Sequence, residues 1–128
     1  MSFRHLLFVF LGGGVGSTAR YLVQELAVRL FGPLFPWGTL AVNLVGSFAL
    51  GAAMFAALAT PPWPTSLRLA IAAGVLGGFT TYSSFNYETV ALMQGGENGL
   101  AAVYLFATVG GCLLAGFLGH LAARALVS

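Results

Sequence analysis

The residues best suited to chemistry lie in one short run, Gly77–Thr89. It begins with two adjacent glycines and Phe79, and the six positions after Phe79 hold four Thr or Ser residues and two aromatic rings: Thr80, Thr81, Tyr82, Ser83, Ser84 and Phe85. Glycine pairs and hydroxyl or β-branched residues weaken a helix, so we expect a helix to break at Gly77–Gly78. Carbonyls freed by such a break could coordinate a cation. The alternative is a kink that serves only packing.

Tyr82 and Phe85 are three residues apart and therefore share one face of a helix. An aromatic ring has a negative face and a positive edge, so a cation approaches the face and a small anion approaches the edge. Aromatic pairs at this spacing commonly serve core packing. The neighbouring hydroxyl groups, together with Asn43 on another segment, favour an anion here.

Two other segments carry polar residues at four-residue spacing, which places each set on one helix face. The sets are Thr39, Asn43 and Ser47, and then Tyr104, Thr108 and Cys112, continuing through Gly116 to His120. The amide of Asn43 offers two donors and an acceptor. It could form a hydrogen bond between helices, or it could face a pore as a donor. The second set either bonds back to nearby carbonyls or lines a narrow polar path. His120, near the helix end, fits an interfacial residue better than a proton relay.

These residues belong to a chain of 128 residues that is 59% hydrophobic and only 6% charged. A soluble domain carries about 25% charged residues. Residues 30–67, 69–87 and 98–123 carry no charge, and about 20 mainly apolar residues suffice to span a membrane. We therefore expect a polytopic membrane protein that has neither a soluble catalytic domain nor a nucleic-acid site. No general base or nucleophile constellation is present, and we expect no catalysis. One cysteine allows no intramolecular disulfide.

Four apolar segments, separated by turns rich in proline and glycine, predict a single four-span membrane domain over residues 1–128. They run from about residue 3 to 30, 37 to 59, 66 to 94 and 100 to 126. Both termini then lie on one side of the membrane. That side receives Arg4, Arg68 and Arg124, and the other receives Arg29 with Arg20. This bias is weak for the positive-inside rule, so either both termini are cytoplasmic or the protein inserts in both orientations.

Four short helices enclose too little space for a wide aqueous path, so a transport pathway would need a dimer or a larger assembly. Small residues four apart, such as Gly12 with Gly16 and Ser47 with Gly51, allow helices to approach closely. The spacing alone leaves open whether these contacts form within one subunit or between subunits.

Three stretches carry a likeness to a known family: Leu11–Tyr21 (LGGGVGSTARY), Trp37–Gly46 (WGTLAVNLVG) and Gly77–Phe85 (GGFTTYSSF). They resemble the signature stretches of the Fluc/CrcB fluoride channels. The likeness extends over the whole chain in length, span layout and order of motifs. The third stretch is specific, whereas the first would not be so on its own.

The resemblance implies an all-α, dual-topology, antiparallel homodimer with two fluoride pores and a central sodium ion. The carbonyls of Gly77 and Thr80 would hold sodium. The pore asparagine of the family corresponds to Asn43, and its two ring residues correspond to Tyr82 and Phe85. The vestibular arginine corresponds to Arg20, and the acidic residue after the motif corresponds to Glu88. We expect the pore to replace the water around fluoride with the Asn43 amide, ring edges and hydroxyls, which belong to Thr39, Ser83, Tyr104 and Thr108.

Several positions depart from the family pattern. Tyr82 stands where Phe is usual, and Cys112 and Gly116 stand where Ser or Thr is expected. Ser84 and Asn86 replace the more usual Thr and Ser. These differences concern ion coordination and rate rather than the class of protein.

The function we expect is passive export of fluoride across a bacterial inner membrane. A rival is a small proton-coupled multidrug exporter, which is also a four-span dual-topology dimer. It would need a membrane-embedded carboxylate in the first helix, where Glu25 is the only candidate. Glu25 lies past Arg20, toward the helix end, where ion pairing explains it better. A scaffold without transport activity is disfavoured by the density of polar groups at 80–89.

Overall fold

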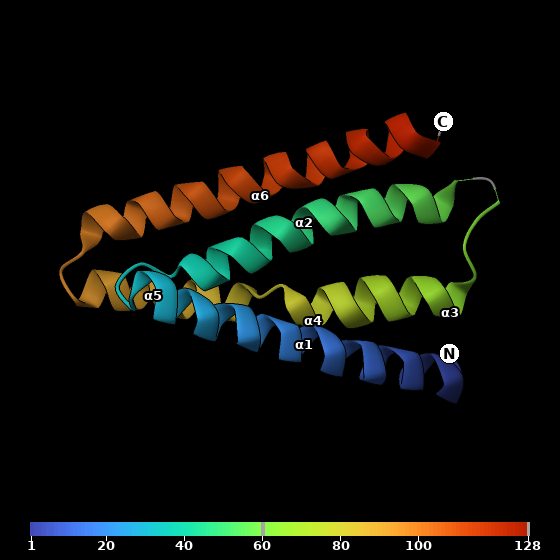
Figure 1. Ribbon diagram of the computed structural model, residues 1–128, viewed down its shortest axis with the longest axis horizontal. Coiled ribbons are helices and arrows are strands. Elements are labelled where there is room, and N and C mark those ends of the chain that lie inside the picture. The colour runs from blue at the N-terminus through green and yellow to red at the C-terminus, as the bar shows by residue number, and fades with distance from the viewer. Residues whose placement is uncertain (60, 128) are drawn as a thin grey trace.

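Helices make up nearly all of residues 1–59 and 61–127, the part of the chain that the computed structural model describes (Figure 1). In chain order they are α1 (Phe3–Phe31), α2 (Trp37–Leu58), α3 (Thr65–Arg68), the π-helical η1 (Leu69–Leu76), α4 (Gly77–Phe79), α5 (Tyr82–Gln94) and α6 (Asn98–Val127). α3, η1, α4 and α5 together form the third predicted segment. The boundaries of all four predicted segments are confirmed to within one or two residues.

The helices associate as two closely packed pairs, α2 with α6 and α1 with η1 and α4. The two pairs meet where α1 packs against α2, and α5, which continues the chain after α4, contacts α6 and α2 at one end of the bundle. Figure 1 shows α3 and both chain termini at the opposite end. Arg4, Arg68 and Arg124 therefore belong to that end, as the sequence predicted, and Arg29 belongs to the end that carries α5.

Glycines bring the paired helices into backbone contact. A Cβ added to Gly16 of α1 would collide with the carbonyl oxygen of Val75, and one added to Gly12 would lie 2.5 Å from the carbonyl oxygen of Ala70. In the other pair, a Cβ on Gly51 would collide with the carbonyl oxygen of Gly116. Gly12, Gly16 and Gly51 thus make close contacts within one subunit.

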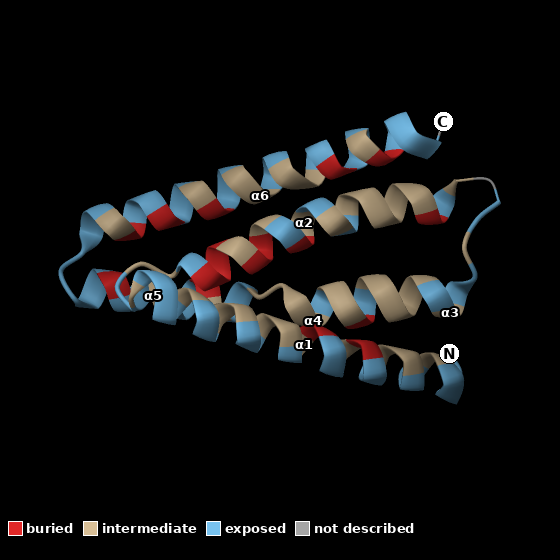
Figure 2. Cartoon of the chain, viewed as in Figure 1, coloured by how far each residue is buried: buried red, intermediate tan, exposed pale blue. Residues whose placement is uncertain are grey.

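The outer surface of the bundle exposes many large apolar side chains. Figure 2 shows buried positions concentrated on the half of α2 that lies near α5, with others along α1 and α6. The core cluster comprises Leu40, Phe85, Leu92, Ala101 and Tyr104. Large apolar side chains are exposed along the outer faces of α1 and α6, as in Phe10 and Phe106. Among the described helices, α1, α2 and α6 are each long and apolar enough to cross a membrane. This distribution of apolar surface belongs to a multi-pass membrane protein.

The third segment is interrupted, as predicted, but not at its glycine pair. Gly77 is helical, with φ −63° and ψ −39°, whereas Thr80 (φ −85°, ψ 157°) and Thr81 (φ −153°, ψ 120°) are extended. The expected break at Gly77–Gly78 was therefore wrong by three residues. Gly78 instead allows close packing, because a Cβ there would lie 2.7 Å from the carbonyl oxygen of Gly13.

Candidate functional site at the helix break

The extended residue Thr81 is held by the side-chain amide of Asn43 from α2. The Thr81 N–H donates to Oδ1 of Asn43 over 2.8 Å, and Nδ2 of Asn43 donates to the Thr81 carbonyl over 3.0 Å. Asn43 is buried. The amide thus replaces hydrogen bonds that a continuous helix would have made. Because Nδ2 carries two hydrogens, this pairing leaves one of them for another acceptor.

Some backbone carbonyl oxygens at the break accept hydrogen bonds, and others do not. Nε of Arg20 donates to the Gly78 carbonyl over 3.1 Å, which places the predicted vestibular arginine at the break. Among the hydrogen bonds of residues 1–59 and 61–127, none ends on the carbonyl oxygens of Gly77 or Thr80. Unbonded carbonyl oxygens at a helix C-terminus carry partial negative charge. Those of Gly77 and Thr80 fit the oxygen ligands that hard cations take.

A hollow of about 370 Å³ lies beside the break, and we call it the central hollow. Its lining includes Asn43, Tyr82, Phe85, Thr108 and Cys112. Tyr82 is largely exposed and meets Phe85 edge to face, with ring centroids 5.7 Å apart. The buried Oγ1 of Thr108 has no hydrogen-bond partner among the described residues. The structure therefore brings together four of the predicted pore residues.

The electrostatic character of the central hollow favours an anion. α5 begins at Tyr82, which lines the hollow, so the N-terminus of a 13-residue helix lies beside it. The Ser84 N–H of this first turn donates to the Thr81 hydroxyl over 3.1 Å. A helix N-terminus carries partial positive charge and binds anions. None of the described residues that line the hollow is acidic. The second N–H of Asn43 and the hydroxyl of Thr108 add two hydrogen-bond donors to an anion in the hollow.

A second group of predicted residues surrounds the carboxylate of Glu88. The Thr39 hydroxyl donates to Oε2 of Glu88 over 3.0 Å, and the Tyr104 hydroxyl donates to Oε1 over 3.2 Å. Thr39 is 1% exposed and Tyr104 is 0% exposed. Both hydroxyls therefore bond to Glu88, and neither residue lines the central hollow.

Gln24 completes this group, and the sequence reasoning missed it. Its Nε2 donates to Oγ1 of Thr39 over 2.9 Å. Because the Thr39 hydroxyl accepts from Gln24, its single proton points to Glu88. Gln24 lies one helical turn after Arg20, so the shared face on α1 was a signal that could have identified it.

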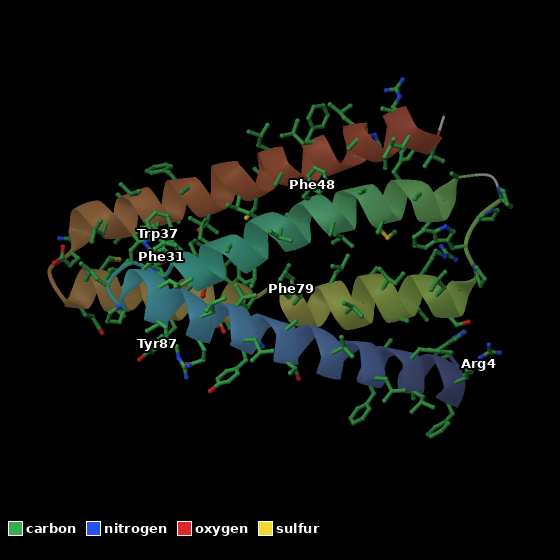
Figure 3. All side chains as sticks on the ribbon, viewed as in Figure 1. Arg4, Phe31, Trp37, Phe48, Phe79 and Tyr87 are labelled. Atoms are coloured by element: carbon green, nitrogen blue, oxygen red, sulfur yellow. The ribbon has the colours of Figure 1, made fainter. Side chains whose placement is uncertain are left out.

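Aromatic rings connect the two groups. Phe85 packs against Tyr104 with ring centroids 5.2 Å apart, and Tyr104 packs against Phe35 at 5.5 Å. Phe35 in turn packs against Trp37 at 4.6 Å. Figure 3 shows Trp37 beside Phe31 at the end of the bundle that carries α5. The rings thus form a continuous series from the helix break to the bundle end.

Three further residues lie apart from the central hollow. Ser83 is exposed, and its hydroxyl lies 3.3 Å from that of Thr81, in a shallow hollow shared with Tyr87 and Glu88. Glu25 is exposed and has no ion-pair partner among the described residues, so the ion pair expected for it was wrong. The exposed His120 meets the ring of Phe55 edge to face at 4.9 Å.

Comparison with known proteins identifies the family. Residues 7–120 match the family model described as CrcB-like protein, Camphor Resistance (CrcB). The chain belongs to the CrcB family. The matched range includes the helix break, Asn43 and the whole Glu88 group.

Relatives in the CrcB family are similar to this chain over almost their full length. A protein of Anaeromyxobacter sp. (strain K), named fluoride-specific ion channel FluC, is 58% identical over 93% of this chain and 94% of its own. Proteins with the same name from Rhizobium etli and Geobacter sulfurreducens are 47% and 46% identical. They cover 94% of this chain in both cases, and 97% and 98% of their own lengths.

Proposed function

We propose that this protein is a channel that lets fluoride leave the bacterial cytoplasm passively across the inner membrane. Its relatives are named fluoride-specific ion channels at up to 58% identity. The observation in this chain that carries the proposal is the central hollow. It combines a helix N-terminus, a spare amide N–H and a hydroxyl that has no partner among the described residues, and none of the described residues that line it is acidic.

Selectivity for fluoride follows from the donors. Fluoride is small and strongly hydrated, so it enters only where other groups replace its water. In the proposed path these groups are the second N–H of Asn43, the hydroxyl of Thr108 and the positive ring edges of Tyr82 and Phe85. Chloride is larger and a weaker acceptor, so the same donors compensate less of its hydration.

In the proposed path, Arg20 would act before fluoride reaches the central hollow, and the group around Glu88 would act after it. The guanidinium of Arg20 raises the local concentration of anions near the break. At the other group, fluoride would compete with the carboxylate of Glu88 for the protons of Thr39 and Tyr104. Ser83 would offer its hydroxyl at the exposed side of α5.

A sodium ion would be held by the carbonyls of Gly77 and Thr80, and it would supply positive charge beside the break. Within the part of the chain that the structure describes, no hydrogen bond ends on these oxygens, which supports the assignment. Because the Thr80 hydroxyl already donates to the Leu76 carbonyl over 2.9 Å, Thr80→Ser should be tolerated. Efflux that is unchanged after exhaustive removal of sodium would contradict an essential ion.

An antiparallel homodimer of four-span subunits would bring further oxygen ligands to the sodium site. Two carbonyls are fewer than the roughly six oxygens that hard cations take, and Gly77 is exposed on the subunit surface. A second subunit related by a two-fold axis would double the number of ligands. Cysteines introduced near the termini of a Cys112→Ser protein should then be labelled on both membrane faces in comparable amounts. Labelling on one face only would contradict dual topology.

Fluoride efflux from liposomes, with and without a proton gradient, tests the proposal against the proton-coupled exporter. Passive efflux needs no proton gradient, and Glu25→Gln should leave it unchanged because Glu25 is exposed and away from the central hollow. Loss of efflux in Glu25→Gln, or dependence on a proton gradient, would favour the exporter.

A further inference from the structure

Cys112 is a nucleophilic side chain that the proposed path does not use. It is the only cysteine of the chain, it is half-buried, and it lines the central hollow together with Asn43, Tyr82 and Phe85. Within the described residues its sulfur is in no disulfide. The thiol therefore faces the same space as the groups proposed to hold the anion.

Thr108, which the proposed function assigns to fluoride, shows that a ligand is expected beside Cys112. It precedes Cys112 by one helical turn and lines the same hollow. Thr108 is 6% exposed, and its Oγ1 lacks a hydrogen-bond partner among residues 1–59 and 61–127. A buried hydroxyl without a partner costs free energy, so a group bound at this point would gain that hydrogen bond.

We infer that Cys112 is a thiol modification site at which a small thiol-reactive compound closes the ion path. The inference rests on the proposed function, because it places the thiol in the fluoride path. The hollow of about 370 Å³ is open and has room for a methylthio group, since a water molecule takes about 30 Å³ in the liquid. An alkyl thiosulfonate is a suitable reagent class, because it is small and uncharged.

The reaction is a thiol exchange that needs no further oxidant. The thiol of Cys112 gives its proton to water, and the thiolate attacks the sulfenyl sulfur of methyl methanethiosulfonate. A disulfide forms between Cys112 and the methylthio group. The sulfur–sulfur bond of the reagent breaks, and methanesulfinate leaves with its electron pair.

The modified side chain blocks the path both by its size and by its chemistry. A methylthio group would occupy the space beside the Asn43 amide and the edge of Phe85. Its sulfur atoms are weak acceptors and offer no proton. Fluoride would therefore lose both the room and the donors that replace its water.

The test uses the complete protein in liposomes, treated with methyl methanethiosulfonate, with two readouts. Intact mass should show one added methylthio group per chain, and fluoride efflux should fall about tenfold or more. Dithiothreitol should remove the group and restore efflux. Cys112→Ser should conduct before treatment and stay unmodified and unaffected after it.

Each contrary result has a distinct meaning. An unmodified protein would show that the thiol is inaccessible, and a modified protein with full efflux would show that Cys112 lies outside the path. Equal loss of efflux in Cys112→Ser would show that the reagent acts elsewhere. Each of these overturns the inference. Absence of fluoride efflux from untreated protein would instead overturn the proposed function.

Discussion

Asn43 of α2 pairs through both ends of its side-chain amide with the backbone of Thr81, at 2.8 Å and 3.0 Å. One side chain from a neighbouring helix therefore satisfies the N–H and the C=O of a residue that the broken helix cannot pair. An unpaired buried backbone group costs about 1–3 kcal/mol, so Asn43 stabilises the break at the same point where it offers a donor to an anion.

Asn43→Asp should abolish fluoride efflux. The carboxylate can still accept from the Thr81 N–H, but it repels the Thr81 carbonyl and any anion in the central hollow. Asn43→Ser keeps one donor and should lose less activity. The measurement is fluoride efflux from liposomes, with gel filtration to check assembly.

Asn86→Asp is the matched control for Asn43→Asp, because Asn86 is exposed on α5 and also gains one negative charge. It should conduct nearly as well as the unaltered protein. If Asn43→Asp conducted equally well, Asn43 would serve only to hold the helices together.

The rings beside the break should differ in their tolerance of substitution. Tyr82→Phe keeps the ring edges and should conduct within about tenfold of the unaltered protein, a barrier change of about 1.4 kcal/mol. Phe85→Ile has no ring edge and should lose most of the efflux. Phe117→Ile, which removes an exposed ring on α6, should have little effect. Full conduction by the double variant Tyr82→Ile, Phe85→Ile would leave these rings as packing alone.

Gln24→Met should reduce efflux through its effect on Thr39. Without the donor from Gln24, the Thr39 hydroxyl is free to turn, and Glu88 loses a fixed partner. A hydrogen bond is worth about 0.5–1.5 kcal/mol, so we expect a loss of a few-fold to about tenfold. Gln94→Met, at the exposed end of α5, serves as the control.

A double-mutant cycle separates this role from a general loss of stability. In a Thr39→Val background, Gln24→Met should cause no further loss of efflux, because the residue acts only through the hydroxyl. Additive losses in the double variant would show that Gln24 acts independently of Thr39.

Gly16→Ala should destabilise the protein, whereas Gly14→Ala should not. The new methyl of Gly16→Ala collides with the carbonyl oxygen of Val75, while a Cβ on Gly14 has no atom within 4 Å. Overpacking typically costs about 1–3 kcal/mol. The midpoint of unfolding in detergent should therefore fall for Gly16→Ala and stay constant for Gly14→Ala. Equal midpoints would show that α1 and η1 can separate without cost.

The helix boundaries could be predicted because each end has a local chemical cause. Glycine and proline end α1 at Gly32 and Pro33, and the apolar runs set the lengths of the helices. The position of the break could not be predicted in the same way. Glycine weakens a helix locally, but Gly77 and Gly78 remain helical because α1 packs closely against this segment. The break moves to Thr80 and Thr81, where Asn43 supplies the missing hydrogen bonds.

The candidate site was predicted in part for a similar reason. Residue type and spacing identified Asn43, Phe85 and Thr108, which meet in the central hollow. The same reasoning grouped Thr39 with Asn43 because both lie on one face of α2. A single helix face still contacts different neighbours along its length, so Thr39 meets Gln24 and Glu88 instead. Such pairings depend on how the helices cross, which one sequence does not specify.

The most direct measurement of the central claim is efflux from liposomes that contain the purified protein and are loaded with both fluoride and chloride. A potassium ionophore balances the charge, and ion-selective electrodes follow both anions at once. We expect rapid loss of fluoride while chloride stays inside. Retention of fluoride as in protein-free liposomes, or equal loss of both anions, would contradict a fluoride-selective path through the central hollow.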